Sequence, residues 1–253
     1  MKTVGVVLSG GGARGAAHLG VLAALNDLNI NISAISGVSA GSIIGALYAA
    51  GHSPASILDV FKKKSLFGIT DIAFMKGGLF SMTGLRNTLK SLIPVDDFSA
   101  LKIPFYVTAT DVAMGCSVSY SEGPLIDTVI ASSSVPVVFE PVAYGGRQLL
   151  DGGILNNLPV EPLMGKYDVI IGSHVNKLHD GVNPVKLTKS SLIEQCFHMA
   201  IAAGVMQRSM ACDVFIEPLL SGFGMFDMKA ADALYEKGYA ATMNHKDMLL
   251  ALI

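Results

Sequence analysis

The sequence is poor in charged residues, and it contains no tryptophan. Only 15% of the 253 residues are charged, and 18 basic against 20 acidic residues leave a net charge of −2. Domains that bind nucleic acids usually carry a basic surface, so we expect no nucleic-acid partner. A hydrophobic content of 51% with so few charges also excludes an intrinsically disordered chain.

Cysteines and long apolar runs are also scarce. Cys116, Cys196 and Cys212 are odd in number and lack the spacing of metal ligands, so we expect neither a disulfide framework nor a metal site. The sequence contains no run of about 18 apolar residues, so we expect no membrane-spanning helix. The first apolar run is short and interrupted by glycines, unlike a secretory signal. We therefore expect a cytoplasmic protein.

The chain is nevertheless strongly apolar, with a mean hydropathy of +0.52. This value indicates a large core, an interface between copies in a homo-oligomer, or an apolar surface near a lipid-like ligand. No repeat or low-complexity linker divides the sequence. Its length is typical of one large α/β domain, so we expect a single domain over residues 1–253.

The first fifty residues alternate between strand and helix patterns. Thr3–Leu8 and Ile32–Ser36 are short apolar runs typical of buried strands, and Ala13–Leu28 and Ser42–Ala50 have helical patterns. This alternation predicts a parallel sheet with helical crossovers. We expect an α/β fold, a three-layer α/β/α sandwich around a mostly parallel sheet.

The rest of the chain continues in the same way. Further strands are predicted over Phe105–Thr110, Val118–Tyr120, Gln148–Leu150, Val169–Gly172 and Val214–Ile216. Further helices are predicted over Pro54–Lys63, Gly84–Leu92, Leu125–Ser132, Leu192–Met210 and Lys229–Leu252. Residues 190–253 form a mainly helical C-terminal part. Residues 61–81 are irregular and apolar, with glycines, which suggests a cover over a pocket or a packed loop.

A serine lies at the second strand-to-helix turn, within Gly37-Val38-Ser39-Ala40-Gly41. A Gly-x-Ser-x-Gly turn between strand and helix holds a nucleophilic serine outward, and its small neighbours allow the strained backbone. The helix N-terminus also favours negative charge that develops beside it. We expect Ser39 to be a nucleophile, with an ordinary helix-capping serine as the alternative.

A glycine loop, Gly10-Gly11-Gly12, lies at the first strand-to-helix turn. Successive backbone N–H groups at a helix start suit an anion, either a phosphate or the oxyanion of an acyl-transfer intermediate. A dinucleotide site would place an acidic residue at the end of the second strand, and a Walker loop would contain Gly-Lys-Ser/Thr. Both features are missing, so we expect no nucleotide cofactor.

A nucleophilic serine needs a base. Asp151 ends a predicted strand and is followed by Gly152 and Gly153, which allow close approach. His174 follows a later strand and would complete the Ser, Asp, His order of α/β-hydrolases. His18 shares a helix face with leucines, which indicates a core residue or one that supports the site.

Three motifs in a fixed order resemble the patatin-like phospholipase family in its short bacterial form: Gly10-Gly11-Gly12-x-Arg14-Gly15, Gly37-x-Ser39-x-Gly41 and Asp151-Gly152-Gly153. The text between the motifs is similar as well, including Asn156-Asn157-Leu158-Pro159. This resemblance implies a Ser39–Asp151 dyad, with the amides of the glycine loop and of Ala40 as the oxyanion hole. It also implies that Arg14 either fixes the loop or contacts a phosphate head group.

We therefore expect a metal-independent serine hydrolase that cleaves carboxylic esters of lipids, of phospholipase A or lysophospholipase type, without a cofactor. An acyltransferase, a thioesterase and a non-catalytic acyl-sensing protein are the alternatives. The run Lys62-Lys63-Lys64, beside Phe61, either contacts an anionic membrane surface or forms a solvated helix end.

Overall fold

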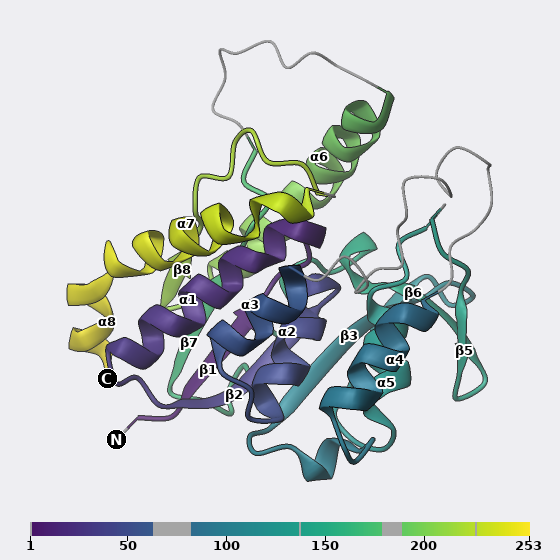
Figure 1. The fold of residues 1–253 in the computed structure, drawn as a ribbon, viewed down its shortest axis with the longest axis horizontal. Helices are drawn as coiled ribbons and strands as arrows, with labels where there is room; N and C mark the ends of the chain where they lie inside the picture. The colour runs from purple at the N-terminus through teal and green to yellow at the C-terminus, as the bar shows by residue number, and fades with distance from the viewer. Residues whose placement is uncertain (1, 63–81, 137, 179–188, 226) are drawn as a thin grey trace.

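A computed structural model of the protein describes residues 2–62, 82–136, 138–178, 189–225 and 227–253 (Figure 1). Its eight strands are β1 (Val4–Leu8), β2 (Ile32–Val38), β3 (Phe105–Asp111), β4 (Cys116–Tyr120), β5 (Val142–Tyr144), β6 (Arg147–Asp151), β7 (Val169–Ser173) and β8 (Val214–Ile216). They form one sheet in which hydrogen-bonded neighbours follow the path β5-β6-β3-β2-β1-β7-β8, and β4 also pairs with β3.

The strands from β3 through β2, β1 and β7 to β8 pair in parallel, whereas β4, β5 and β6 join the sheet by antiparallel pairing. β1 pairs in parallel with β2 and β7, β2 with β3, and β7 with β8. β4 and β6 pair antiparallel with β3, and β5 with β6. The prediction of a mostly parallel sheet is confirmed.

Helices cover both faces of the sheet. They are α1 (Ala16–Asp27), α2 (Ala40–Ala49), α3 (Pro54–Lys62), α4 (Thr83–Leu92), α5 (Leu125–Ser132), α6 (Lys189–Ser209), α7 (Ala231–Met243) and α8 (Lys246–Leu252). Alternate strand residues point to opposite faces. Val6 and Leu8 of β1 pack into the large core beneath α1 and α2, whereas Val7 packs into a smaller cluster with Val205 of α6. The three-layer arrangement is therefore confirmed.

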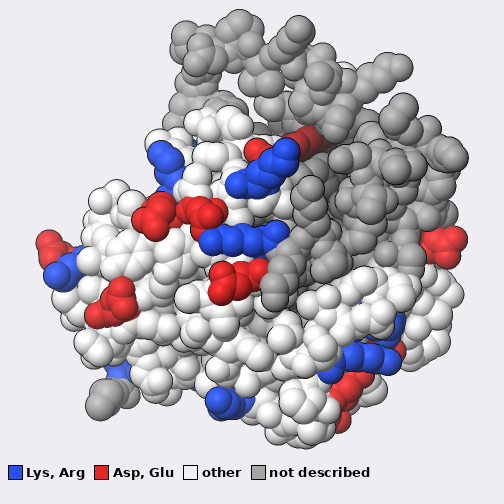
Figure 2. Space-filling model, viewed as in Figure 1, with Lys and Arg blue, Asp and Glu red and all other residues white. Residues whose placement is uncertain are grey.

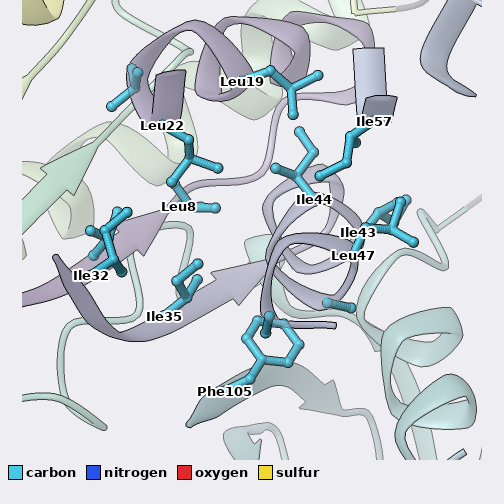
Figure 3. Close-up of a cluster of buried hydrophobic side chains, with 14 of the residues drawn as sticks. Leu8, Leu19, Leu22, Ile32, Ile35, Ile43, Ile44, Leu47, Ile57 and Phe105 are labelled. Carbon is cyan, nitrogen blue, oxygen red and sulfur yellow. The ribbon is translucent and has the colours of Figure 1, made fainter. Parts of the chain in front are cut away.

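The large core joins the first two βα units, as Figure 3 shows. Leu8 of β1 and Ile35 of β2 lie beneath Leu19 of α1 and Ile44 of α2, and all four side chains are fully buried. This packing fixes the two strand-to-helix turns that carry the glycine loop and Ser39. The fold thus holds the two turns side by side at the carboxyl ends of the parallel strands β1 and β2.

Two sequence predictions about elements were wrong. The single helix predicted over Lys229–Leu252 is a 3₁₀ turn (Met228–Ala230) followed by α7 and α8. The break lies at Asn244 and His245, where the His245 ring bonds the carbonyl of Ala241 at 2.9 Å, a group that the backbone of a continuous helix would use. Strand β5 was missed because it has only three residues before its turn.

The predicted cover over residues 61–81 lies almost wholly outside the described residues. At its start, Phe61 is buried and Lys62 forms an ion pair with Asp232 of α7. On the face in Figure 2, basic side chains lie beside acidic ones rather than in a patch of one sign. None of the described helices is both long and apolar enough to cross a membrane.

Candidate active site

Strand pairing brings Ser39 and Asp151 together. β2 pairs with the first half of β3, up to Val38 opposite Thr108, and β6 pairs with the second half, where Asp151 lies opposite Ala109. β4 pairs with residues from both halves of β3, so it occupies the other edge. β2 and β6 therefore meet end to end along one edge of β3. Ser39 directly follows the end of β2, and Asp151 ends β6.

The two side chains are in direct contact. The Ser39 hydroxyl donates a hydrogen bond of 2.6 Å to Oδ2 of Asp151. The other carboxylate oxygen, Oδ1, accepts a 2.7 Å bond from the amide of Gly153. Both side chains are buried, since Ser39 is 8% exposed and Asp151 is 3% exposed. The carboxylate is therefore fixed in a position from which it can accept the serine proton.

The backbone at Ser39 is strained. Its φ of 52° and ψ of −125° lie in a region that residues with a side chain rarely adopt. Surrounding bonds hold it there: the Ser39 amide donates to Oγ of Ser132 at 2.9 Å, and its carbonyl accepts from the amide of Ser42 at 2.8 Å. Such strain is common at active sites and agrees with the sharp turn that the sequence predicts.

Glycines next to the two side chains permit close backbone packing. A Cβ atom at Gly41 would lie 2.3 Å from the carbonyl oxygen of Leu8, and one at Gly37 would lie 2.5 Å from that of Gly41. At Gly152 it would lie 2.3 Å from the carbonyl oxygen of Thr108. Helix α2 can therefore begin directly above β1, and β6 can end directly against β2 and β3.

Burial changes the acidity of Asp151. It raises the pKa of this carboxyl to about 6, against the hydrogen bonds from Ser39 and Gly153, which lower it. Desolvation disfavours the charged form of any acid, whereas bonds donated to a carboxylate favour that form. The resulting pKa makes Asp151 a stronger base than a solvated aspartate while leaving it mostly ionised at neutral pH.

Two asparagines hold the first peptide of the glycine loop. The Gly10 amide donates to Oδ1 of Asn157 at 3.1 Å, and the Gly10 carbonyl accepts from Nδ2 of Asn176 at 2.7 Å. Both asparagines are buried. The Gly10 amide was predicted to belong to an oxyanion hole, but it is already engaged by Asn157. The predicted set therefore reduces to Gly11, Gly12 and Ala40.

The amides of these three residues remain available. Among the described residues, Gly11, Gly12 and Ala40 donate no backbone hydrogen bond. Gly12 begins a 3₁₀ turn (Gly12–Gly15) that leads into α1, and Ala40 begins α2. Free N–H groups at helix starts attract anions. The two turns thus hold three amides that have no acceptor among the described residues.

Arg14 fixes the glycine loop to the C-terminal part of the chain. Its guanidinium donates to the carbonyl of Phe223 at 2.7 Å and forms a 2.7 Å ion pair with Glu194 of α6. It also lies 3.4 Å from the ring of His198. Of the two roles considered from the sequence, this geometry agrees with fixing the loop, because the guanidinium already has these partners.

The histidines considered from the sequence have other partners than Ser39. His174 bonds Glu217 through Nδ1 at 2.9 Å, so the structure brings Asp151 and not His174 to the serine. His18 is fully buried and bonds the hydroxyl of Ser173 and the carbonyl of Ser9. Burial lowers the pKa of His18 to about 4, so its ring is neutral at neutral pH. Through its bond to Ser9, the ring supports the residue that precedes the glycine loop. Over the described residues, no cluster of potential metal ligands occurs.

Comparison with known proteins places the chain in a family. The family model described as "Patatin-like phospholipase" matches residues 6–164, which include the glycine loop, Ser39 and Asp151. The chain belongs to the patatin-like phospholipase family.

Curated relatives of this patatin-like chain are identical to it at about a third of the residues in the matched region. An uncharacterised NTE family protein of Mycobacterium tuberculosis is 33% identical over 64% of this chain and 46% of its own length. The neuropathy target esterase of Drosophila melanogaster is 30% identical over 63% of this chain and 12% of its own length. The match thus spans less than half of each of these relatives.

Solved structures share the fold of this patatin-like chain over nearly its whole length. VipD from Legionella pneumophila matches with a TM-score of 0.57 and 16% identity, over 98% of this chain and 67% of VipD. A human cytosolic phospholipase A2, solved with methyl gamma-linolenyl fluorophosphonate, matches with a TM-score of 0.54 and 12% identity, over 99% of this chain and 58% of the enzyme chain. At sequence identities this low, the structural similarity shows a shared fold and nothing about function.

Three residues of the candidate site were not singled out from the sequence. Ser132 accepts the bond from the Ser39 amide, and Asn157 and Asn176 hold Gly10. Asn157 lies in a stretch that resembles the family, which was a signal that could have identified it. Ser132 lies between the motifs, in the stretch Ala131–Pro136 that also resembles the family, so the same signal applied to it. Asn176 lies outside the three motifs, and its contact with Gly10 identifies it.

Proposed function

We propose that the protein hydrolyses carboxylic ester bonds of lipids, with a phospholipid or a lysophospholipid as substrate. The observation that carries the proposal is the 2.6 Å bond between the hydroxyl of Ser39, on a strained turn, and the buried carboxylate of Asp151. Membership of the patatin-like phospholipase family supports a lipid as the ester. In this proposal Ser39 is the nucleophile and Asp151 is the base.

The first half of the reaction forms an acyl-enzyme. The oxygen of Ser39 attacks the ester carbonyl carbon while its proton passes to Oδ2 of Asp151. The carbonyl oxygen becomes an oxyanion, which the amides of Gly11, Gly12 and Ala40 stabilise; in other enzymes one such donor contributes about 3 kcal/mol. The intermediate collapses as the carbon–oxygen bond to the alcohol breaks, and Asp151 returns the proton to that alcohol.

The second half repeats the same chemistry with water. Asp151 accepts a proton from a water molecule, whose oxygen attacks the acyl carbon on Ser39. The second tetrahedral intermediate uses the same three amides and releases the fatty acid, with the proton returned to the Ser39 oxygen. Each step uses this chain's own groups, and the proposal assigns no step to a metal or cofactor.

A fluorophosphonate probe tests the proposed nucleophile. We expect one stoichiometric adduct on the peptide that contains Ser39, detected by intact mass and peptide mapping. Ser39→Ala should remove the adduct, and Asp151→Asn should slow its formation at least a hundredfold, because general bases contribute about 10²–10⁴-fold. Ser91→Ala, which changes an exposed serine of α4, is the matched control and should label like the parent. A folded protein that forms no adduct would contradict the proposal.

His174 provides a second test, because it is the base of the alternative triad. His174→Gln should retain ester hydrolysis, since its ring bonds Glu217 rather than Ser39. Turnover of a short-chain ester and of a lysophospholipid should both be measured. If His174→Gln stayed folded by circular dichroism but lost turnover as fully as Asp151→Asn, a triad would replace the dyad.

A further inference from the structure

Helix α6 presents an exposed apolar stripe along its whole described length. It consists of six residues, which we call the α6 seam: Leu192, Cys196, Met199, Ala203, Met206 and Met210, the last just after the helix. Met199, Met206 and Met210 are 52%, 64% and 80% exposed. A continuous apolar surface of this kind on a folded domain usually marks an interaction site.

The spacing of the seam indicates a helical partner. Its residues follow one another at intervals of four, three, four, three and four, which is the a and d pattern of a coiled coil. Ile201 and Val205 are buried on the opposite side of α6, and Val205 packs into the cluster that contains Val7 of β1. A flat lipid surface does not require a narrow stripe with this period, whereas packing against a second helix does.

The seam is free of charge. The acidic and basic side chains that the structure describes on α6 are Glu194 and Arg208, and each pairs within the chain, with Arg14 and Glu161. Gln195 and Gln207, which flank the seam, are uncharged. An uncharged helix face is complementary to itself, because two copies meet without repulsion between like charges. A partner selected by charge would instead require charged positions beside the seam.

We propose that the α6 seam is the interface of a homodimer, in which α6 packs against α6 of a second copy in antiparallel orientation. α6 lies at the upper end of the molecule in Figure 1, and the seam residues are exposed. The inference is independent of the proposed function. It assigns the interface to a defined face, with two-fold symmetry and the same residues contributed by both copies.

The order of large and small residues favours the antiparallel arrangement. A two-fold axis near the middle of the seam places Met199 opposite Ala203, Cys196 opposite Met206, and Leu192 opposite Met210. Each central layer then joins one large and one small side chain, which fills space evenly. Parallel helices would place Ala203 opposite Ala203 and Met206 opposite Met206, so that gaps would alternate with crowded layers.

Sedimentation velocity of the full chain tests the dimer. At about 100 μM we expect a species of twice the 26.5 kDa chain mass, because a single helix pair is a small interface with an expected dissociation constant in the micromolar range. Met206→Lys should give a monomer, because it places two lysines in the interface. Met114→Lys is the matched control: Met114 is 72% exposed outside the seam, and this variant should remain dimeric.

Two results would overturn the inference. One is a parent chain that stays monomeric at this concentration. The other is a dimer that Met206→Lys leaves intact. Flotation with phosphatidylcholine vesicles then tests the alternative occupant: a monomeric parent that binds vesicles and loses binding in Met206→Lys would assign the seam to a lipid surface instead.

Disulfide trapping tests the orientation separately. The background is Cys116→Ser, which removes the other exposed cysteine. Antiparallel pairing predicts that adding Met206→Cys gives a rapidly cross-linked dimer, through Cys196 of one copy and the new cysteine of the other. The background protein, whose one exposed cysteine is Cys196, should cross-link much more slowly. Equal cross-linking of the two proteins would indicate parallel helices and overturn the proposed register.

Discussion

At the scale of single residues, burial without a charged partner determines the acidity of Asp151. No cation contributes to its raised pKa of about 6, which results from desolvation against two hydrogen bonds. In the proposed Ser39–Asp151 dyad the carboxylate itself accepts the serine proton, so the proposed reaction depends directly on the basicity of that carboxylate. Desolvation therefore makes Asp151 more basic than a solvated aspartate, and the proposed chemistry depends on this basicity.

This acidity predicts the pH dependence of ester hydrolysis. Only ionised Asp151 can accept the Ser39 proton, so kcat/KM should be constant above about pH 7 and fall about tenfold for each pH unit well below pH 6. The measurement is a pH–rate profile with a neutral ester substrate. Circular dichroism at each pH is the control for folding. A profile that stays flat down to about pH 4.5 would contradict a base with this pKa.

The same shift predicts that the ionised Asp151 carboxylate reduces the free energy of unfolding. The pKa is about 6 in the folded protein against the ordinary 3.8, so the folded state binds the proton more tightly. The cost is therefore fully present above about pH 6 and disappears as the pH falls through 4. Asp151→Asn should raise the free energy of unfolding at pH 8 by about 1–3 kcal/mol, measured with urea, and the gain should shrink towards pH 4.

Asp97 provides a control with the opposite sign. It is a helix-capping residue whose hydrogen bonds from Ser99 lower its pKa. Asp97→Asn should therefore lose stability at pH 8, and that loss should diminish at low pH. A loss of stability in Asp151→Asn at pH 8 would show that the carboxylate is favourably bound rather than desolvated at a cost.

At the scale of elements, a largely buried ion pair connects α6 to the glycine loop. The side chains of Arg14 and Glu194 are 13% and 15% exposed, and their 2.7 Å contact links the start of α1 to α6. Glu194→Gln would leave the Arg14 charge buried without a counter-ion. We expect a loss of about 2–4 kcal/mol in the free energy of unfolding, because breaking a buried pair leaves an uncompensated charge.

A second pair on the same helix is the matched control. Arg208 and Glu161 are also 2.7 Å apart, but the Glu161 side chain is 50% exposed. Glu161→Gln should therefore cost no more than about 1 kcal/mol, as is usual for exposed pairs. Both variants should be measured by urea unfolding at the same ionic strength. Equal losses would show that burial of Arg14 does not strengthen the link to the loop.

Local sequence patterns predicted the helices and strands better than the contacts between distant segments. The buried strands and the two turns followed from apolar runs that end in glycine or serine, and these are local patterns. The contact between Ser39 and Asp151 depends on β2 and β6 sharing one edge of β3, which is a pairing between distant segments. Local patterns do not encode such pairing, so only the family resemblance brought the two residues together. Asn176 was not predicted for the same reason, because its contact with Gly10 joins segments that are far apart in the sequence.

At the scale of the whole molecule, the fold extends beyond the family match. The matching residues end at 164, whereas VipD shares the fold over 98% of the chain. β7 pairs with β1 at the centre of the sheet, and α7 covers α1 so closely that a Cβ atom at Gly238 would lie 1.9 Å from the carbonyl oxygen of Ala17. The glycine loop lies between β1 and α1, so both C-terminal elements support it from outside the matched region.

We therefore predict that the region with the three family motifs cannot fold without the C-terminal helices. A chain ending at residue 230 lacks α7 and exposes the apolar face of α1, so it should show no cooperative thermal transition by circular dichroism. A chain ending at residue 244 loses only α8, whose Leu249 is fully buried, and should unfold cooperatively with about 3 kcal/mol less stability. A cooperative transition in the shorter chain would show that residues up to 230 form an independent unit, and that α7 stabilises the glycine loop without being needed to form it.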